Sequence, residues 1–315
     1  MTRTWIVPVV AALALFALPA VLTPYTQDLV VKIAIYAVFA LSLELLVGVT
    51  GLVSLGHAAF LGIGAYVTVL AAGDSGGSVA TVAALAVLAA AGYALFVGAL
   101  SLRTKGVYFI MVTLAFAQMA YFVFHDTKLA GGSDGLFLYA KPALGALNLD
   151  DKRHLYYTVI VTLVATYALL ALLMRSRFGH ALAGIRVNEQ RMRAAGFATF
   201  GYKLAAFVIA GAIAGLAGFL LAIKDGAVNP ELLSWHESGA VLLMLILGGI
   251  GSLRGAVIGA IAFTLLKELF QLESLLGPVA SHWQMTLGFT IIAFVALLPK
   301  GLIGLRSRFS GAAHG

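Results

Sequence analysis

Uncharged apolar runs, separated by short polar segments, occupy most of the 315-residue chain. A helix that crosses a bilayer needs about 20 consecutive apolar residues, because each residue adds about 1.5 Å along the helix axis. Such runs predict spans near residues 5–22, 28–48, 54–72, 79–100, 106–124, 155–174, 204–223, 238–250, 255–272 and 284–299. The pattern therefore predicts an all-α polytopic membrane protein with about ten transmembrane helices, in one transmembrane domain over residues 1–315.

Both ends of this pattern are less regular than its middle. The run 238–250 is short, and Gly248-Gly249-Ile250-Gly251 interrupts the pattern before 255–272. At the N-terminus, Arg3 precedes the apolar run 5–22, which is the charge order of a signal peptide. That run is longer than usual for a signal peptide, and no clear A-x-A cleavage site follows it. We therefore expect a retained first span.

The charges of the loops predict which side of the membrane each loop faces. Residues 175–203 contain six bases and one acid, Glu189, and short cytoplasmic loops are the ones enriched in Lys and Arg. With both termini cytoplasmic, every short basic loop falls inside, whereas the mixed loop 125–154 and the acidic loop 224–237 fall on the periplasmic side. Merging 238–250 with 255–272 would place the basic C-terminal tail outside, so the loop charges favour ten spans.

The basic loop 175–203 also has the pattern of short helices. Leu182, Ile185, Met192 and Ala195 recur at roughly helical spacing. Asn188 is a typical N-cap for the turn that follows it, and Gly196 is a typical helix end. Short amphipathic helices at a membrane surface usually contact a partner, so we expect this loop to be a docking element.

Two turns share a local pattern that suggests an internal duplication. The segment 51–55 reads Gly-Leu-Val-Ser-Leu, and the segment 249–253 reads Gly-Ile-Gly-Ser-Leu. Both are expected at turns on the same side of the membrane, and transporters are often built from repeats.

Composition supports a helical bundle in the membrane and argues against a nucleic-acid partner. Hydrophobic residues make up 62% of the chain and charged residues 10%, with 35 glycines and no cysteine. Glycine is frequent where membrane helices pack closely. The net charge of +7 comes from bases in short loops, which the sidedness rule explains.

Sequence motifs that bind nucleotide phosphates or metal ions are absent from the chain. It contains no G-x-x-x-x-G-K-[ST] phosphate loop, no H-E-x-x-H and no cysteine cluster. We therefore expect neither ATP hydrolysis nor a metal site in this polypeptide, and no cofactor bound to it.

Glu44 is the main ionisable residue expected inside a span, where charges are costly and therefore informative. One interpretation is a proton or cation site; the other is a carboxylate that faces a wet inner cavity or pairs with a base of a loop. His57, at the start of the third span, is either a hydrogen-bonded structural group or a relay. The candidates for lining a translocation path are Glu44, Ser54, His57, Tyr66, Tyr108, Thr113 and Gln118.

Glycines spaced four residues apart predict close helix contacts. Gly211 and Gly215 form one such face, and Gly251, Gly255 and Gly259 form another. Packing alone explains such faces; helix sliding or a narrow path is the alternative.

Several motifs together resemble the permeases of branched-chain amino acid ABC importers. The early hairpin contains Leu45–Gly51 (LLVGVTG), Ser54–Phe60 (SLGHAAF) and Gly62–Tyr66 (GIGAY). Further along, the resemblance continues in Arg103–Phe109 (RTKGVYF), Gly131–Gly135 (GGSDG), Ser176–Gly179 (SRFG) and Pro299–Leu302 (PKGL). The elements SLGHAAF and GGSDG are similar to the LivM-like branch of the family rather than to its LivH-like partner.

This resemblance implies the partners of the chain. Such a machine combines two permease subunits, here with a LivH-like second subunit, two cytoplasmic ATPases that bind ATP and Mg²⁺, and a periplasmic binding protein, all at the bacterial inner membrane. The loop 175–203 would be the coupling loop that docks into a groove on the ATPase. The residues implied for this role are Gly179, Leu182, Ile185, Arg186, Glu189, Arg191, Met192, Arg193 and Gly196.

Four positions differ from the family pattern: Glu44, Val49, His180 and Ala256. Glu44 and Val49 lie near the hairpin that is expected to line the path, so the solute stays open between branched-chain amino acids and amides, urea or aromatic acids. Two other classes of function are the alternatives to an importer subunit. An ion-coupled secondary transporter would use Glu44, and a membrane enzyme would need a nucleophile, a base and a metal that the sequence does not supply.

Overall fold

Long helices dominate the computed structural model, which describes residues 19, 23–144, 147–272, 277, 282–298 and 301–304. Six helices in this part of the chain are long and apolar enough to cross a membrane. They are α2 (Pro24–Glu44, continued by a π-helix over Leu45–Thr50), α3 (Ala58–Ala72, continued by a 3-10 turn over Gly73–Ser75), α4 (Val79–Ser101), α5 (Val107–Asp126), α6 (Lys152–Arg175) and α9 (Thr199–Asp225). They correspond to six predicted spans, so the chain is an all-α polytopic membrane protein.

The next two predicted spans form a sharply bent pair of helices. α10 (Trp235–Gly248) and α11 (Leu253–Gln271) are bent by 114° at the break between them, which is the geometry of a broken span or a re-entrant loop. α13 (Trp283–Leu297) is apolar but only 15 residues long. Apart from Pro19, the first predicted span, 5–22, lies outside the described residues, so the number ten stays a prediction.

Two glycines and a serine produce the break between α10 and α11. Gly249 has φ 113° and Gly251 has φ 97°, a region of backbone conformation that residues with a Cβ rarely adopt. Ser252 then begins the next helix, because its hydroxyl accepts a hydrogen bond from the Gly255 amide at 3.1 Å. The hydropathy pattern alone does not reveal such a turn, since the residues of the turn are small and largely apolar.

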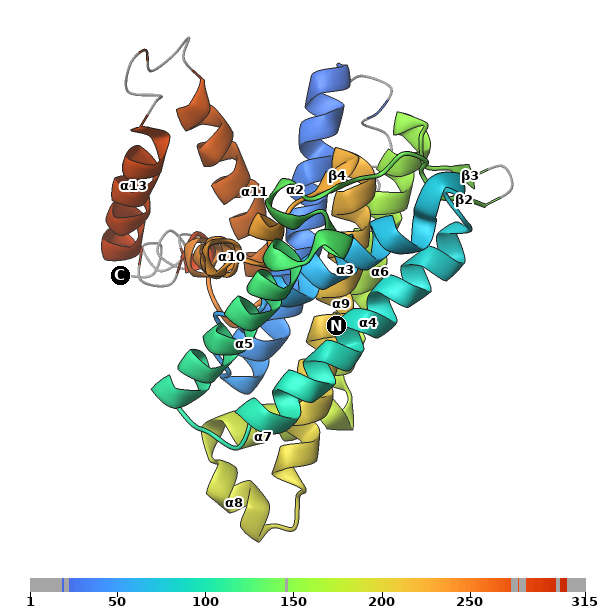
Figure 1. Cartoon of the computed structure of the whole chain (residues 1–315). Coiled ribbons are helices and arrows are strands. Elements are labelled where there is room, and N and C mark those ends of the chain that lie inside the picture. Colours follow the sequence, from blue (N-terminus) through green and yellow to red (C-terminus); the bar gives the residue numbers. More distant parts are fainter. Residues whose placement is uncertain are drawn as a thin grey trace.

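α2, α3 and α9 form the centre of the bundle, and α4, α5 and α6 lie around it (Figure 1). In the apolar windows of α2 and α9, 78% of the residues are buried, against 22% in α5. α3 and α9 approach most closely at Gly64 and Gly218, where a Cβ would overlap the backbone of the other helix. These two positions therefore require glycine for the observed packing.

Two short ribbons of strand lie at one end of the molecule. β1 (Leu136–Phe137) pairs antiparallel with β4 (Ala227–Val228), with Leu136 opposite Val228. β2 (Ala143–Leu144) pairs antiparallel with β3 (Leu147–Asn148). The first ribbon joins the loop that follows α5 to the loop that follows α9.

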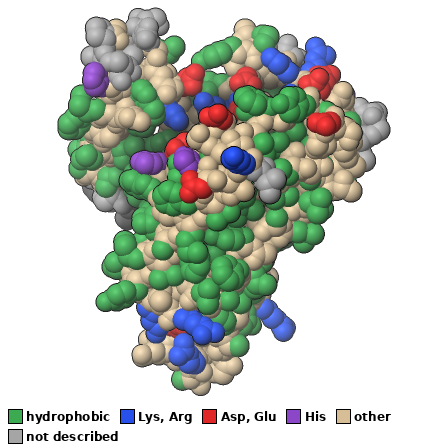
Figure 2. Space-filling view, in the orientation of Figure 1, with side chains coloured by type: hydrophobic (Ala, Val, Ile, Leu, Met, Phe, Trp, Pro, Cys, Tyr) green, Lys and Arg blue, Asp and Glu red, His purple; other side chains and the backbone are tan. Residues whose placement is uncertain are grey.

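The opposite end of the molecule carries α7 (Arg177–Val187) and α8 (Glu189–Ala194) (Figure 1). Figure 2 shows Lys and Arg side chains gathered at this end, whereas most Asp and Glu side chains lie toward the other end. The charge asymmetry that the loops predict is therefore present in the folded molecule.

Candidate functional site

Side-chain caps define the α7–α8 segment. The Ser176 hydroxyl accepts a hydrogen bond from the Gly179 amide at 3.4 Å and begins α7. Asn188 accepts one from the Arg191 amide at 2.9 Å and begins α8, as the sequence predicts. Gly196, with φ 87°, follows the end of α8, which is also as predicted. At the corner between α6 and α7, a Cβ on Gly179 would overlap the backbone of Met174.

One side of α7 is buried against the transmembrane helices of the same chain. Leu182 is 0% exposed and Ile185 is 4% exposed. Met192 of α8 packs its side chain against Gly184 of α7, which fixes the angle between the two short helices. Leu182 and Ile185 therefore hold α7 in place on its own bundle. The exposed residues of the segment include Ala183, Val187, Gln190, Arg191 and Ala195.

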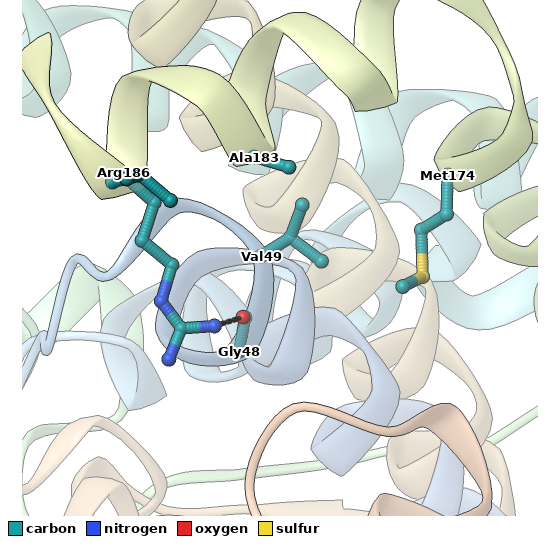
Figure 3. Close-up of a pocket in the computed structure, with 6 residues that line it drawn as sticks. Gly48, Val49, Met174, Ala183 and Arg186 are labelled. Carbon is teal, nitrogen blue, oxygen red and sulfur yellow. Dashed lines mark hydrogen bonds between the residues drawn. The ribbon is translucent and has the colours of Figure 1, made fainter.

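Arg186 connects α7 to the end of the first described span. Its guanidinium donates a hydrogen bond to the carbonyl of Gly48, in the π-helix that continues α2 (Figure 3). Carbonyls in the last turn of a helix lack partners within the helix, and a nearby cation both pairs with them and interacts favourably with the helix dipole. Beside this contact is a cavity of about 410 Å³, lined by Gly48, Val49, Met174, Ala183, Arg186 and Val187.

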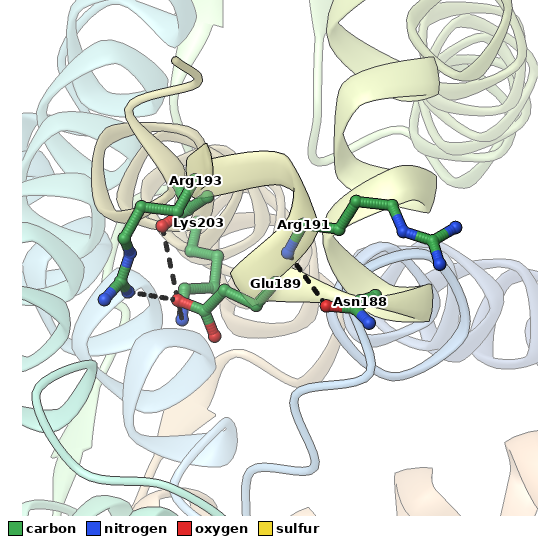
Figure 4. Close-up of polar contacts among 6 residues, drawn as sticks. Asn188, Glu189, Arg191, Arg193 and Lys203 are labelled. Atoms are coloured by element: carbon green, nitrogen blue, oxygen red, sulfur yellow. Dashed lines mark hydrogen bonds and ion pairs between the residues drawn. The ribbon is translucent and has the colours of Figure 1, made fainter. Parts of the chain in front are cut away.

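Glu189 connects α8 to the start of α9 (Figure 4). Its Oε1 accepts hydrogen bonds from Lys203 at 2.9 Å, from Arg193 at 3.0 Å and from the Thr199 hydroxyl at 3.3 Å. Partial burial acts to raise the pKa of Glu189, but the Lys203 ammonium and the Thr199 hydroxyl outweigh it and hold that pKa below its usual value. Glu189 and Arg193 are therefore engaged within the chain, and Arg191 extends away from Glu189.

A second cavity, of about 340 Å³, lies between α7, the start of α5 and the start of α9. Its ionisable lining residues are Lys105, Arg186, Lys203 and Glu189, so bases outnumber the acid. Another part of its wall is formed by Thr50, the last residue of the π-helix, and by Gly51, Leu52 and Val53 of the turn that follows. The α7 end of the bundle thus has a polar, basic interior as well as a basic surface.

Three of the predicted path residues meet around Gly56, between α2 and α3. The Ser54 hydroxyl accepts a hydrogen bond from the Gly56 amide at 3.2 Å, and Gly56 lies directly against the Thr113 backbone of α5. His57 is fully buried, shares a 2.7 Å hydrogen bond with Ser42 and stacks on Phe39. These groups are hydrogen-bonded inside the packed core of the chain.

The other predicted path residues are dispersed. Glu44 is fully buried at the end of α2, and its Oε1 accepts a hydrogen bond from the Gly251 amide at 2.8 Å. Tyr66 is buried further along α3, with its ring 4.4 Å from that of Phe124. Gln118 is half-buried on α5, and Tyr108 is 77% exposed near the start of that helix. The structure therefore does not collect the seven residues into one surface.

The glycines predicted to pack helices lie in three different environments. Gly211 and Gly215 of α9 face the Cβ atoms of Ala94 and Ala90 in α4. Gly255 and Gly259 lie against backbone atoms of Gly249 and Met244, so that α11 approaches α10 closely. Gly251 instead belongs to the turn and has nothing within 4 Å of its Cβ position.

Four residues important to this arrangement were not identified from the sequence as site residues: Ser42, Gly48, Lys203 and Ser238. Ser238 of α10 accepts a hydrogen bond from the Ala58 amide at 2.9 Å, which joins α10 to the start of α3. Gly48 follows Glu44 by one helical turn, and a Cβ there would overlap the Glu44 carboxyl group. That four-residue spacing is the one signal in the sequence that could have identified Gly48.

Comparison with known proteins gives one consistent result. A family model described as the permease component of branched-chain amino acid transport systems matches residues 25–296. The high-affinity branched-chain amino acid permease LivM of Escherichia coli (strain K12) is 29% identical, over 91% of this chain and 72% of its own length. BraD of Pseudomonas aeruginosa is 24% identical over 89% of this chain and 96% of its own length. LivH of Escherichia coli (strain K12) is 28% identical over 46% of each chain. No solved structure matches.

Proposed function

Because the chain belongs to the family of branched-chain amino acid transport permeases, we propose that it forms half of the membrane pathway of an ATP-driven importer. It is a permease subunit and a multi-pass protein of the bacterial inner membrane. The observation that carries the proposal is the family match, which spans nearly all the described helices. A LivH-like second permease is the proposed partner, since relatives of both kinds match this chain. The proposed solutes are branched-chain amino acids delivered by a periplasmic binding protein.

The proposed orientation places α7 and α8 in the cytoplasm and the strand ribbons in the periplasm. The bases of α7 and α8 support it, because positive loops stay on the cytoplasmic side. Both termini are then cytoplasmic if α10 and α11 enter and leave the membrane on one side, as in a re-entrant loop. In that case the chain returns after α11 to the side of the membrane from which α10 starts, and two full spans would return it to the same side.

The α7–α8 segment is the proposed contact for a cytoplasmic ATPase, which would bind ATP and Mg²⁺. Three kinds of contact fix this segment to the bundle: the buried face of α7, the hydrogen bond from Arg186 to the Gly48 carbonyl, and the bonds of Glu189 to α9. A fixed element transmits force better than a mobile loop. Val187 is 83% exposed and Arg191 is also exposed, so these two residues are the proposed centre of the docking surface.

The double variant Val187→Asp with Arg191→Glu tests this docking surface. We expect at least about ten-fold weaker binding of the ATPase, equivalent to about 1.4 kcal/mol, because a charge enters the apolar contact and another is reversed. The measurement is the amount of ATPase that co-purifies with the permease pair from membranes. Tyr139→Asp is the matched control, since Tyr139 is also 83% exposed but follows β1 at the other end of the molecule. Normal co-purification of the double variant would contradict the assignment.

An ion-coupled transporter that uses Glu44 is the alternative. The hydrogen bond from the Gly251 amide gives this carboxylate a partner within the protein, so its presence does not require a transported ion. We therefore retain the ATP-driven importer as the proposed function.

A further inference from the structure

Glu44 is a buried carboxylate that accepts a hydrogen bond from a residue 207 positions away in the sequence. Its Oε1 accepts the hydrogen bond of the Gly251 amide, whereas Oε2 has no hydrogen-bond partner among the described residues. Burial of an acid is costly, and an apolar side chain would fill the same space at lower cost. The side chain therefore has a use that packing alone does not explain.

The partner amide belongs to the turn at which α10 and α11 bend by 114°. In this turn the Gly249 amide donates to the Leu245 carbonyl of α10 at 2.8 Å, whereas the Gly251 amide has its acceptor outside both helices, at Glu44. A backbone amide without an acceptor in its own helices is satisfied by another part of the protein or by water. Glu44 supplies that partner and so attaches the turn to the end of α2.

On the other side of Glu44 the chain connects to α7. The Glu44 carboxyl group lies over Gly48, in the space that a Cβ would occupy. The carbonyl of the same Gly48 accepts the hydrogen bond from Arg186 of α7. Gly48 lies in the π-helical segment Leu45–Thr50, and π-helical turns are wider and less regular than α-helical ones. Arg186 and Glu44 therefore meet at one segment of backbone that is not locked by ordinary helical geometry.

We propose that Glu44 is a positioning residue that transmits displacement of α7 to the turn between α10 and α11. The link runs from Arg186 to the Gly48 carbonyl, and from the Glu44 carboxylate over Gly48 to the Gly251 amide. This inference rests on the proposed transport function, in which α7 is moved by the ATPase. It names the route by which that movement reaches the helices far from the ATPase.

The link ends at the turn between α10 and α11, and α10 in turn contacts the start of α3. α10 holds the start of α3 through the hydrogen bond from the Ala58 amide to Ser238. It packs on α11 through glycine contacts, which present few side-chain obstacles to a small shift. Movement of the turn would therefore reach the region around Ser54 and His57.

Three substitutions at two positions test the link in the complete importer, reconstituted in proteoliposomes. Glu44→Leu removes the acceptor, Glu44→Gln keeps an acceptor oxygen, and Gly48→Ala displaces the carboxyl group without changing it. The measurement is the ratio of solute taken up to ATP hydrolysed, together with the ATPase that co-purifies. We expect Glu44→Leu and Gly48→Ala to lower the ratio at least about ten-fold with normal co-purification, and Glu44→Gln to stay within about two-fold of wild type.

Arg186→Met provides the second test, since it cuts the link at its other end and leaves Glu44 bonded to Gly251. If Arg186 and Glu44 act in series, the double variant Arg186→Met with Glu44→Leu takes up as much solute per ATP as the more impaired of the two single variants. A loss of uptake per ATP in the double variant equal to the product of the two single losses would overturn the proposal. Equal defects in Glu44→Gln and Glu44→Leu would also overturn it, because the charge rather than the acceptor would then matter.

Thr264→Val is the matched control for a buried polar group of α11. Thr264 is 3% exposed and its hydroxyl has no hydrogen-bond partner among the described residues, so uptake per ATP should not change. Failure of the wild-type complex to couple uptake to ATP would count against the proposed function. Normal wild-type coupling with normal coupling in Glu44→Leu would count against the link alone.

Discussion

The segments 51–55 and 249–253 share glycine first, serine fourth and leucine fifth, yet they join their helices differently. After the π-helix, Gly51 adopts the left-handed conformation with φ 73° and ψ 19°, and an irregular segment leads to α3 at Ala58. Gly249 has φ 113° and ψ 108°, and α11 begins only four residues later, at Leu253. The first turn connects two full spans, whereas the second joins two helices that are bent by 114°.

The serines of the two segments have the same role, because each hydroxyl accepts a hydrogen bond from a backbone amide close in the sequence. Ser54 accepts the amide of Gly56 at 3.2 Å, and Ser252 accepts the amide of Gly255 at 3.1 Å. The two turns thus use one kind of local hydrogen bond in different backbone paths. The difference teaches that the glycines set the direction of the chain and the serines only satisfy amides. An internal duplication stays a prediction.

Substitution of the leading glycines should separate the two turns most strongly. We expect Gly249→Ala to lower the free energy of unfolding by about 3 kcal/mol, since its conformation lies outside the regions open to alanine. Gly51→Ala should cost about 1 kcal/mol, because the left-handed conformation is only moderately unfavourable with a Cβ. Thermal unfolding of the purified permease in detergent measures both. Equal losses at the two positions would mean that the turns are equivalent.

Removal of the two serine hydroxyls should have smaller and more similar effects. Ser54→Ala leaves a buried amide without its acceptor and should cost about 2 kcal/mol. Ser252→Ala removes an N-cap that is only half-buried and should cost about 1 kcal/mol. The same unfolding assay applies, and Ser133→Ala, in the exposed loop before β1, is the control. A larger loss at Ser252 than at Ser54 would contradict this assignment of roles.

The smallest effect is expected outside both turns, at the contact of Glu189 with Lys203. Because the pKa of Glu189 is lower in the folded protein, its stabilising contribution is complete above the unfolded pKa of about 4.3. It is lost as the pH falls through the lower, folded pKa. The contribution should be less than about 1 kcal/mol, as the pair is partly solvated.

Hydrogen exchange of the α8 amides against pH measures this contact. Relative to the intrinsic exchange rate at each pH, the α8 amides of Glu189→Gln should be less protected than those of wild type at pH 7, and their protection should not fall further below pH 4. Gln190→Ala, at an exposed neighbouring position, should follow wild type. An unchanged exchange rate in Glu189→Gln would show that α8 is held by the Met192 contact alone.

Most of the features that could be predicted depend only on residues that are close together in the sequence. The spans from 28–48 to 204–223 follow from apolar runs, because burial in lipid demands them wherever they occur. Asn188 and Gly196 were recognisable because a cap acts on amides only two to four residues away. Long-range geometry was not accessible in this way. No local signal indicates that Leu182 and Ile185 face their own bundle, or that Glu44 meets an amide 207 residues distant.

The bend between α10 and α11 could not be predicted from hydropathy for a related reason. Two spans with a tight turn and two helices bent by 114° have the same order of apolar and small residues. The angle depends on how closely Gly255 and Gly259 let the helices approach, and on what holds the turn. Both are properties of the packed structure.

Energy dependence of uptake tests the central claim most directly. Vesicles that contain the complete importer should accumulate labelled leucine only with ATP on the cytoplasmic side and with the binding protein present. An uncoupler that collapses the ion gradients should leave the uptake unchanged. Uptake that continues without ATP and stops with the uncoupler would contradict the account and favour an ion-coupled carrier.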